Sequence, residues 1–521
     1  MSVRVKSSVI SCFKMHGLSL RSDATKYLSE ILSTLNEREQ EDWLERIVET
    51  VRKQPLTSAL LKKDLIEAAV EECKQGDDDE NDNVFNIISS FSLPRFTFNQ
   101  EQKKFLRDSK PVNLHGNADV KTALFLDRYT LLHQRTSRHN LFTPPVQGST
   151  LDSKTTKFQL KSVEFLLGST AKIGELIVLG MLTQIKEGKY FLEDPTGAVE
   201  LDLSKAQFHK GFFTENSFVL AEGWYEDEVF HVNGLGFPPP EPADVSRSFF
   251  GSLNFFGGPL PTCAKSSAKL AALEESNQDA MFVLLSDIWL DQVRVREKLA
   301  TLFLGYSEMP PTCFIFCGNF SSAPYGHNHI KTLQESFKLL ADMICEHPYL
   351  AENSKFVFVP GPQDPGPASI LPRPPIPACI TDYITQRVPS AVFTTNPCRI
   401  QYCSQEIVVF REDIIMKMCR NSIKFPDSRT EIPKNFMKSV VCQAHLSPLP
   451  LHVSPVYWSY DNALRIYPLP DLIVFGDKYD PYTVTTAGCI GTNTGSFSKN
   501  SYSFKVYYPS NKTVEDSQIE D

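Results

Sequence analysis

Apolar side chains recur at helical spacing through the first 75 residues. Val5, Val9 and Phe13 stand four positions apart, and Gly17 follows them as a stop signal. The pattern predicts a small helical bundle over residues 1–75 whose stripes form an ordinary core. Three further stripes of the same period cover residues 22–35, 36–55 and 61–76, and the stripe at 36–55 opens on Asn36 with Glu39 three residues later, a capping-box pattern.

An acidic stretch then interrupts the apolar pattern. Residues 77–82 contain only Asp, Glu and Asn, and a run of this kind cannot bury itself. It predicts a flexible linker over residues 76–93. Residues 94–157 have a mixed character with one helix-like stretch at 120–134, so we interpret them as a connecting segment.

The hydrophobic period changes to two between residues 158 and 237. Val199, Leu201 and Leu203 alternate with polar residues, and Gly188 lies in a hairpin turn between two short strands. Five or six short antiparallel strands of this length and spacing predict a small barrel of the OB-fold type over residues 158–240.

From about residue 277 the strands become solid apolar runs, separated by stretches long enough for helices. Such runs are typical of a sheet that is buried on both faces and covered by helices. One covering helix is predicted at 333–344. The fold class is therefore multidomain α+β, with a helical bundle, a barrel and an α/β sandwich over residues 241–521. The six runs are 281–286, 313–317, 356–359, 407–410, 440–442 and 472–475.

Composition limits the partners and cofactors. The chain has 521 residues and is 41% hydrophobic, so most of it is expected to fold into buried cores. Its formal net charge of -9 argues against bare nucleic acid as the main partner, although a local basic groove is compatible with that average. The 12 cysteines include no CxxC pair, so we expect buried free thiols, no structural zinc site and no cofactor.

No stretch of the sequence has the pattern of a signal peptide or a membrane span. Ser11, Lys14 and His16 interrupt the apolar residues near the N-terminus, and Asp287 breaks the most apolar later stretch, 281–290. We therefore expect a soluble intracellular protein without a membrane partner.

Polar or glycine-bearing turns follow the apolar runs of the last domain. Ligands of open sheets gather at the carboxyl ends of strands, so these turns mark the candidate site. The residues of interest there are Asp287, Trp289, Asn319, Gln363, Asp364, His445, Asp477 and Tyr479.

The order of these turns resembles the calcineurin-like metallophosphoesterases, which hold two metal ions on Asp, Asn and His side chains. Asn319 stands where that family has a metal-bridging aspartate, and Trp289 stands in place of a histidine. Trp and Pro have no ligating atom, and an amide is a weak ligand. The other substituted positions are Pro362, Gln363, Asp477 and Tyr479.

The resemblance therefore implies a phosphoesterase-like domain with no catalytic residue and no metal. Asp287, Asp364 and His445 are expected to remain as hydrogen-bonded vestiges. The rival interpretation is an active nuclease with unusual ligands. The proline-rich stretch 360–377 is interpreted as a rigid loop over the degenerate site rather than a peptide ligand for a partner module.

An inactivated domain of this kind behind an OB-fold resembles the B subunits of the replicative DNA polymerases, over about Phe158 to the C-terminus. The additional helical domain is similar to that of the epsilon branch, with the alpha branch as the alternative. The resemblance implies a nuclear accessory subunit without catalytic activity. Its partners would be the zinc-bearing C-terminal region of the epsilon catalytic subunit and, through residues 1–75, the replicative helicase.

The barrel also raises a different possibility, a module that binds single-stranded DNA. Such sites interleave aromatic residues with Lys and Arg. Here Trp224 and Tyr225 lie between Glu222 and Glu226, whose charges repel phosphates. We favour aromatic residues that serve the core and a protein interface, with DNA bound weakly or indirectly.

Overall fold

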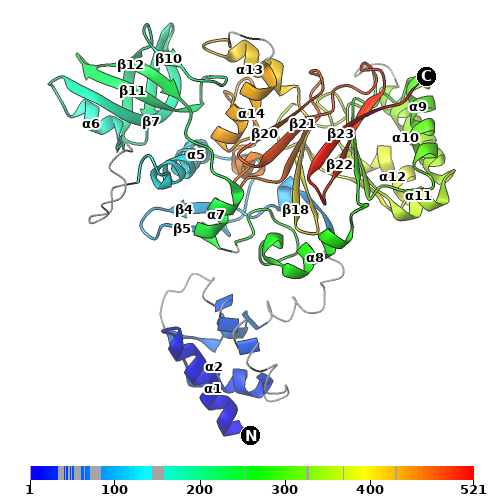
Figure 1. The fold of residues 1–521 in the computed structure, drawn as a ribbon, viewed down its shortest axis with the longest axis horizontal. Helices are drawn as coiled ribbons and strands as arrows, with labels where there is room; N and C mark the ends of the chain where they lie inside the picture. Colours follow the sequence, from blue (N-terminus) through cyan, green and yellow to red (C-terminus); the bar gives the residue numbers. More distant parts are fainter. Residues whose placement is uncertain are drawn as a thin grey trace. The chain divides into compact units, whose positions relative to one another are not determined.

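A computed structural model describes residues 2–32, 84–143, 158–251, 253–323, 328–367, 369–426, 428 and 431–520, together with short stretches and single residues between 40 and 70. The described chain is a mixed α/β protein made of two compact units (Figure 1). The smaller unit contains residues 1–85 and two short segments between 252 and 266, and the rest forms the larger unit. None of the described helices is long and apolar enough to cross a membrane.

The smaller unit has its own apolar core. Helices α1 (Ser2–Met15) and α2 (Ser22–Leu32) follow the predicted stripes, and Gly17 has the positive φ of 72° that ends the first of them. Two short parallel strands, β1 (Ser19–Leu20) and β2 (Leu60–Leu61), were not predicted. The proposed capping box at Asn36 and the acidic run 77–82 lie outside the described residues. Core side chains include Val9, Phe13, Leu28, Ile47, Val51 and Ile66.

The predicted linker 76–93 is wrong in its second half. Residues Phe85–Ser89 form strand β3, and Ser90–Ser92 form the short 3-10 helix η1. Ile88 is buried in a core of the larger unit, and the Ser90 hydroxyl donates to the Pro397 carbonyl over 2.5 Å. The strand is the edge strand of a six-stranded sheet and buries Ile88, which an acidic linker could not do.

The connecting segment contains more structure than one helix. Strands β4 (Phe96–Asn99) and β5 (Lys104–Arg107) pair as a hairpin. The predicted helix is present and longer than expected, as α5 (Ala118–Arg138). Its buried residues include Arg128 and Arg135, which is unusual for arginine and shows that one face of this helix is buried in the larger unit.

Residues 160–236 form a closed barrel, in agreement with the period of two. Strands β12 and β9 pair in parallel and close the sheet. Its elements are β6 (Leu160–Lys161), α6 (Val163–Leu167), β7 (Ile173–Lys186), β8 (Lys189–Asp194), β9 (Gly197–Asp202), β10 (Gln207–Phe208), β11 (Phe218–Glu226) and β12 (Val229–Gly236).

The rest of the larger unit contains two six-stranded sheets that face each other. The rings of Phe282 and Tyr402, one from each sheet, lie 5.4 Å apart. In spatial order the first sheet has β16 (Ala391–Phe393), β15 (Lys355–Val359), β14 (Cys313–Cys317), β13 (Phe282–Ser286), β22 (Ser503–Tyr508) and β23 (Thr513–Gln518). The second has β20 (Tyr482–Thr486), β21 (Cys489–Asn493), β19 (Leu472–Phe475), β18 (Gln405–Phe410), β17 (Cys398–Tyr402) and β3.

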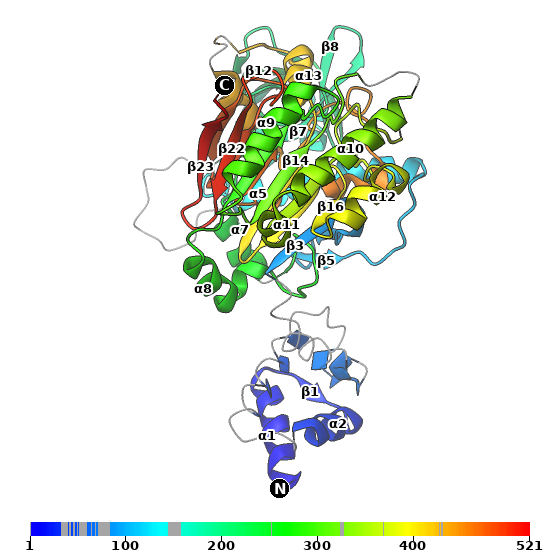
Figure 2. The same ribbon diagram turned by 90° about the vertical axis from the view of Figure 1, so that its right-hand side faces the viewer.

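Helices cover the outer face of each sheet (Figure 2). In β13, Val283 and Leu285 pack into the core under the helices, whereas Phe282 and Leu284 are buried on the other face, toward the second sheet. Burial on both faces explains the solid apolar runs. The first sheet is covered by α9 (Val293–Gly305), α10 (His329–Cys345), α11 (Pro348–Asn353) and α12 (Ala378–Arg387), and the second by α13 (Ile414–Asn421) and α14 (Ile432–Gln443).

The apolar run 440–442, predicted as a strand, is the last turn of α14. A short apolar run has no period of its own, so the sequence alone could not separate a strand from a buried helix end. The buried residues Phe436 and Val440 lie one helical turn apart, and Ala444 ends the helix in the left-handed conformation. Shorter elements complete the unit: α7 (Ala243–Phe250), η2 (Ala264–Ser266), α8 (Ala268–Ser276) and η4 (Trp458–Leu464).

Helices α5 and α14 join the barrel to the two sheets. The Gln443 side chain accepts from the Phe218 amide over 2.8 Å and donates to the Phe218 carbonyl over 2.7 Å, as a strand neighbour would. From α5, Arg135 donates to the carbonyls of Val441 and Cys442 at the end of α14. These buried contacts fix the orientation of the barrel.

Candidate functional site

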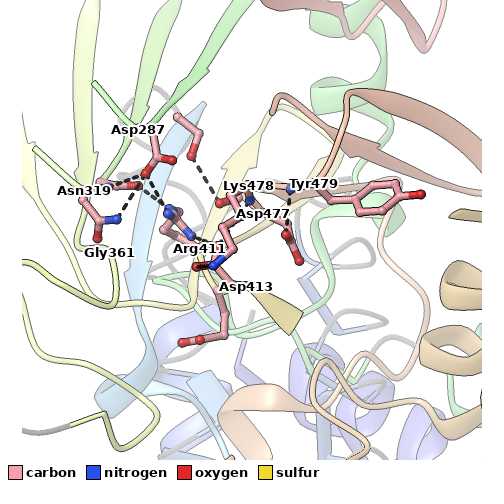
Figure 3. Close-up of polar contacts among 12 residues, drawn as sticks. Asp287, Asn319, Gly361, Arg411, Asp413, Asp477, Lys478 and Tyr479 are labelled. Carbon is pink, nitrogen blue, oxygen red and sulfur yellow. Dashed lines mark hydrogen bonds and ion pairs between the residues drawn. The ribbon is translucent and has the colours of Figure 1, made fainter. Parts of the chain in front are cut away.

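The carboxyl ends of five strands meet where the two sheets face each other (Figure 3). Asp287 follows β13, Asn319 follows β14, Gly361 follows β15, Arg411 follows β18 and Asp477 follows β19. The backbones approach closely here: a Cβ on Gly318 would lie 1.8 Å from an Asp364 carboxylate oxygen. The sequence-predicted edge therefore exists, and only glycine fits at position 318.

Arg411 occupies the centre of this edge. Its side chain is fully buried, and Nη2 donates to Asp287 Oδ1 over 2.7 Å. Nη1 donates to Asp413 Oδ1 over 3.0 Å, and Nε donates to the Gly318 carbonyl. Burial opposes the charged form, but Asp287 and Asp413 together raise the pKa of Arg411. A permanent cation thus lies among the oxygen atoms of three strand ends.

Asp287 accepts three hydrogen bonds through one carboxylate oxygen, Oδ1. The same Oδ1 atom accepts from the Asn319 backbone amide over 3.1 Å and from Asn319 Nδ2 over 3.2 Å. Asp287 is 4% exposed and has a φ of 54°, an uncommon backbone conformation for a non-glycine residue.

Asp364 and Gln363 hold the loop that follows β15. The Asp364 carboxylate accepts from the backbone amides of Phe320 (2.8 Å) and Gly361 (2.7 Å), while burial raises its pKa to about 6. The Gln363 backbone amide donates to Asn319 Oδ1 over 2.9 Å. Arg373, further along the same proline-rich segment, donates to the carbonyls of Gly361 and Pro362, so an ordered loop lies beside the site.

Asp477 accepts a hydrogen bond from the first turn of helix α13. Its Oδ2 accepts from the Ile415 amide in the first turn of α13, and its Oδ1 accepts from the Tyr479 amide, both over 2.9 Å. Burial raises the pKa of Asp477 to about 6. The Tyr479 ring is half-buried against the core under α13 and α14. Both residues therefore have local structural partners.

His445 takes part in a different cluster. It follows α14 rather than a strand, and its Nε2 lies 3.3 Å from Asp461 Oδ1. Its Nδ1 accepts from the Ser447 amide over 3.1 Å, so the proton is on Nε2. Burial and the neighbouring Arg128 lower the pKa of His445. Arg128 also binds Asp461 directly, and this triad ties α5 to η4.

Trp289 packs on the helix-covered core of the first sheet. Its backbone amide donates to Ser498 Oγ over 3.4 Å, and Ser498 in turn donates to the Asp287 carbonyl over 2.6 Å. The Lys499 ammonium lies 5.1 Å from the centre of the Trp289 ring. Trp289 therefore contributes to the core beside the site and offers no ligating atom.

These residues do not fit a pair of divalent metal ions. The arginine cation lies between the carboxylates of Asp287 and Asp413, and one oxygen of each already accepts from an N–H donor. His445 hydrogen-bonds elsewhere. In the part of the chain that the structure describes, no three His, Cys, Asp or Glu side chains are grouped so that they could hold a metal ion.

Sequence reasoning missed Arg411. Phe410-Arg411-Glu412-Asp413 follows an apolar run in the same way as the turns that were singled out. The signal for Arg411 is its position directly after a strand, but arginine is not a metal ligand and so does not fit the pattern of a metal site.

Comparisons with known proteins agree with this architecture. The family of the B subunits of DNA polymerases alpha and epsilon matches residues 282–484, "DNA polymerase epsilon subunit 2-like, OB-fold domain" matches 118–239, and "DNA polymerases epsilon N terminal" matches 1–73. DNA polymerase epsilon subunit 2 of Bos taurus is 60% identical over 99% of both chains. The Homo sapiens protein of the same name is also 60% identical, over the same shares, and the Drosophila melanogaster protein is 42% identical over 99% of this chain and 98% of its own.

The chain belongs to the DNA polymerase epsilon subunit 2 family. The epsilon matches cover the helical and barrel domains, which decides the branch of the family that the sequence analysis left open. Among solved structures, one titled as a novel archaeal phosphodiesterase covers 46% of this chain and 99% of its own, at 9% identity and a TM-score of 0.26, which is too low to support an argument.

Replacement of Arg411 by Met is expected to destabilise this epsilon subunit 2 family member by about 3–5 kcal/mol, because Asp287 and Asp413 lose their buried cation. Chemical denaturation measures the change. Arg294→Met, at an exposed position, is the matched control and should change stability by less than about 0.5 kcal/mol. Adding Asp287→Asn to Arg411→Met should restore part of the loss, since one unpaired charge disappears. A double variant that is no more stable than Arg411→Met would contradict this account.

Proposed function

We propose that this chain is the non-catalytic accessory subunit of DNA polymerase epsilon, and that it scaffolds the zinc-bearing C-terminal region of the catalytic subunit in the nucleus. Family membership supports the accessory role in DNA replication. The observation that carries the non-catalytic assignment is Arg411, whose guanidinium lies where the strand ends of a phosphoesterase would hold metal. On this proposal the two-sheet domain has a calcineurin-like fold without the metal site and therefore without phosphoesterase activity.

The rigid attachment of the barrel supports binding of one partner across both domains. Gln443 bonds both backbone groups of Phe218, and the Phe212 amide donates to Ser439 Oγ over 2.8 Å. A surface whose two halves are fixed relative to each other loses little conformational entropy when a partner binds.

The geometry of Trp224 argues against the barrel as a base-stacking module. The His231 ring stacks on it at 4.0 Å, and the Lys172 ammonium lies 4.1 Å from the centre of the same ring. These two neighbours cover the aromatic surface that a base would need. His231 is held in turn by Asp202, 3.0 Å away.

The purified chain is expected to hold no stoichiometric Mn, Fe or Zn and to leave phosphodiesters intact. Arg411 fills the centre of the edge, so a divalent ion placed there would be repelled by a buried positive charge. Elemental analysis and a phosphodiesterase assay with added Mn²⁺ provide the measurements. Two metal ions per chain, with hydrolysis that is lost in His445→Ala, would establish the active nuclease instead.

Co-expression with the C-terminal region of the epsilon catalytic subunit should give a complex that co-elutes and raise the yield of soluble chain. A truncated chain lacking residues 1–75 should co-elute equally well, because those residues have their own core and belong to a separate compact unit. Loss of the complex on this deletion would place the helical domain in the scaffold.

Residues 1–75 are proposed to contact the replicative helicase. The described part of this unit closes an apolar core without help from the rest of the chain, which supports independent docking. The fragment 1–75 should therefore fold by itself, as measured by circular dichroism, and retain purified helicase components in a pull-down. A fragment that folds and captures none of them would remove the helicase link while leaving the scaffold proposal intact.

A further inference from the structure

A basic surface lies where the barrel meets α13 and α14, and we name it the junction patch. Residues 414–443 contain six Lys or Arg and two Asp or Glu, in a chain whose formal net charge is -9. Positive charge is therefore concentrated here rather than spread over the protein. The junction patch consists of Lys210, Arg420, Lys424, Phe425, Lys434 and Lys438.

Close contacts connect these residues across the junction. The Lys424 ammonium lies 5.3 Å from the centre of the Phe208 ring in β10. Lys210, two residues after Phe208, pairs with Glu431 over 3.0 Å. Glu431 directly precedes α14. Within α14, Lys434 and Lys438 are spaced by about one helical turn and therefore share a face of the helix. An antiparallel backbone bridge between Thr214 and Ser422 holds the two sides together.

Most of the cations in the patch have no carboxylate partner. Lys210 pairs with Glu431, and nearby Lys417 pairs with Glu412. Among the described residues, no carboxylate lies within 4.0 Å of the charged atoms of Arg420, Lys424, Lys434 or Lys438. Unpaired cations gathered on one face create a local positive potential, even on an acidic protein.

An exposed aromatic ring accompanies this charge. Phe425 is 46% exposed and adjoins Lys424 in sequence. Its only close ring neighbour of those described is Phe212, at 6.4 Å and tilted by 57°, so no ring stacks on it. A face that combines unpaired cations with an open aromatic ring matches the chemistry of single-stranded nucleic acid, whose phosphates need cations and whose unpaired bases stack.

We propose that the junction patch binds single-stranded DNA, with Lys424, Lys434 and Lys438 on the phosphates and Phe425 under a base. The barrel's own surface suits this ligand less well, because residues 158–240 contain 6 Lys against 12 Asp or Glu. The proposal extends the accessory role and does not depend on how the chain holds the catalytic subunit.

The test uses the full chain and a fluorescein-labelled oligo(dT) of about twenty nucleotides, with binding followed by anisotropy at several NaCl concentrations. The triple variant Lys424→Glu/Lys434→Glu/Lys438→Glu should bind at least about tenfold more weakly at low salt. Its slope of log affinity against log salt should fall by about 2, because each lost phosphate contact removes about 0.7.

The control triple Lys104→Glu/Lys121→Glu/Lys331→Glu changes the net charge by the same amount at exposed positions outside the patch. It should bind like the unaltered chain. Equal weakening in both triples would mean that only the overall charge matters, and it would overturn the proposal. Circular dichroism and thermal melting establish that each variant is folded.

Two single variants test the contact with a base. Phe425→Ala should weaken binding about fivefold with an unchanged salt slope, since stacking releases no counterions. Trp224→Ala should leave binding unchanged. Oligo(dT) binding that is lost in Trp224→Ala and kept in Phe425→Ala would place the site on the barrel and refute the junction patch.

Further outcomes separate this proposal from the scaffold. A duplex of the same length that competes as well as the single strand would refute the preference for single strands. A patch triple that binds oligo(dT) normally but no longer co-elutes with the catalytic-subunit region would make the patch a protein interface. A patch triple that no longer binds oligo(dT) but still co-elutes with the catalytic-subunit region supports the proposal. An unaltered chain that binds oligo(dT) but does not co-elute with that region contradicts only the scaffold role.

Discussion

The buried guanidinium of Arg411 connects the strand ends of the two sheets of this chain. It comes from β18 in the second sheet and binds Asp287 after β13 and the Gly318 carbonyl after β14, both in the first. Asp413, directly before α13, accepts from its Nη1. Removing one partner of such a pair leaves an uncompensated buried charge, which is why these strand ends depend on a single side chain.

The surrounding residues follow from that constraint. Gly318 and Gly476 must lack a side chain, because a Cβ would lie 1.8 Å from Asp364 Oδ2 and 2.7 Å from Arg411 Cδ respectively. Asn319 becomes a donor to Asp287 and an acceptor from Gln363, a double role that an aspartate could not fill. Arginine stays protonated at any physiological pH, so this edge is held together without a supply of metal ions.

A second set of arginines, on α5, holds together the elements next to the barrel. Along α5, Arg128 binds Asp461, Arg135 binds the end of α14, and Arg138 binds Glu241 at 3.0 Å. The helix therefore contacts three segments that follow the barrel in the sequence. The rigid relation between the domains is what the proposed scaffold role requires, and the chain's membership of the epsilon subunit 2 family is consistent with that role.

The sequence by itself determined the order of helices, barrel and sheets, because burial on one or two faces leaves a local periodic pattern. It also located the strand ends and showed that Trp289, Asn319, Tyr479 and their neighbours are poor ligands. It could not assign residues 440–442 to α14 or residues 85–89 to β3, since a short apolar run has no period of its own. Only the tertiary structure decided that the Arg411 side chain lies between the strand ends and that His445 hydrogen-bonds to Asp461. Asp287 and Arg411 are 124 residues apart, and long-range charge pairing is set by topology rather than by local pattern.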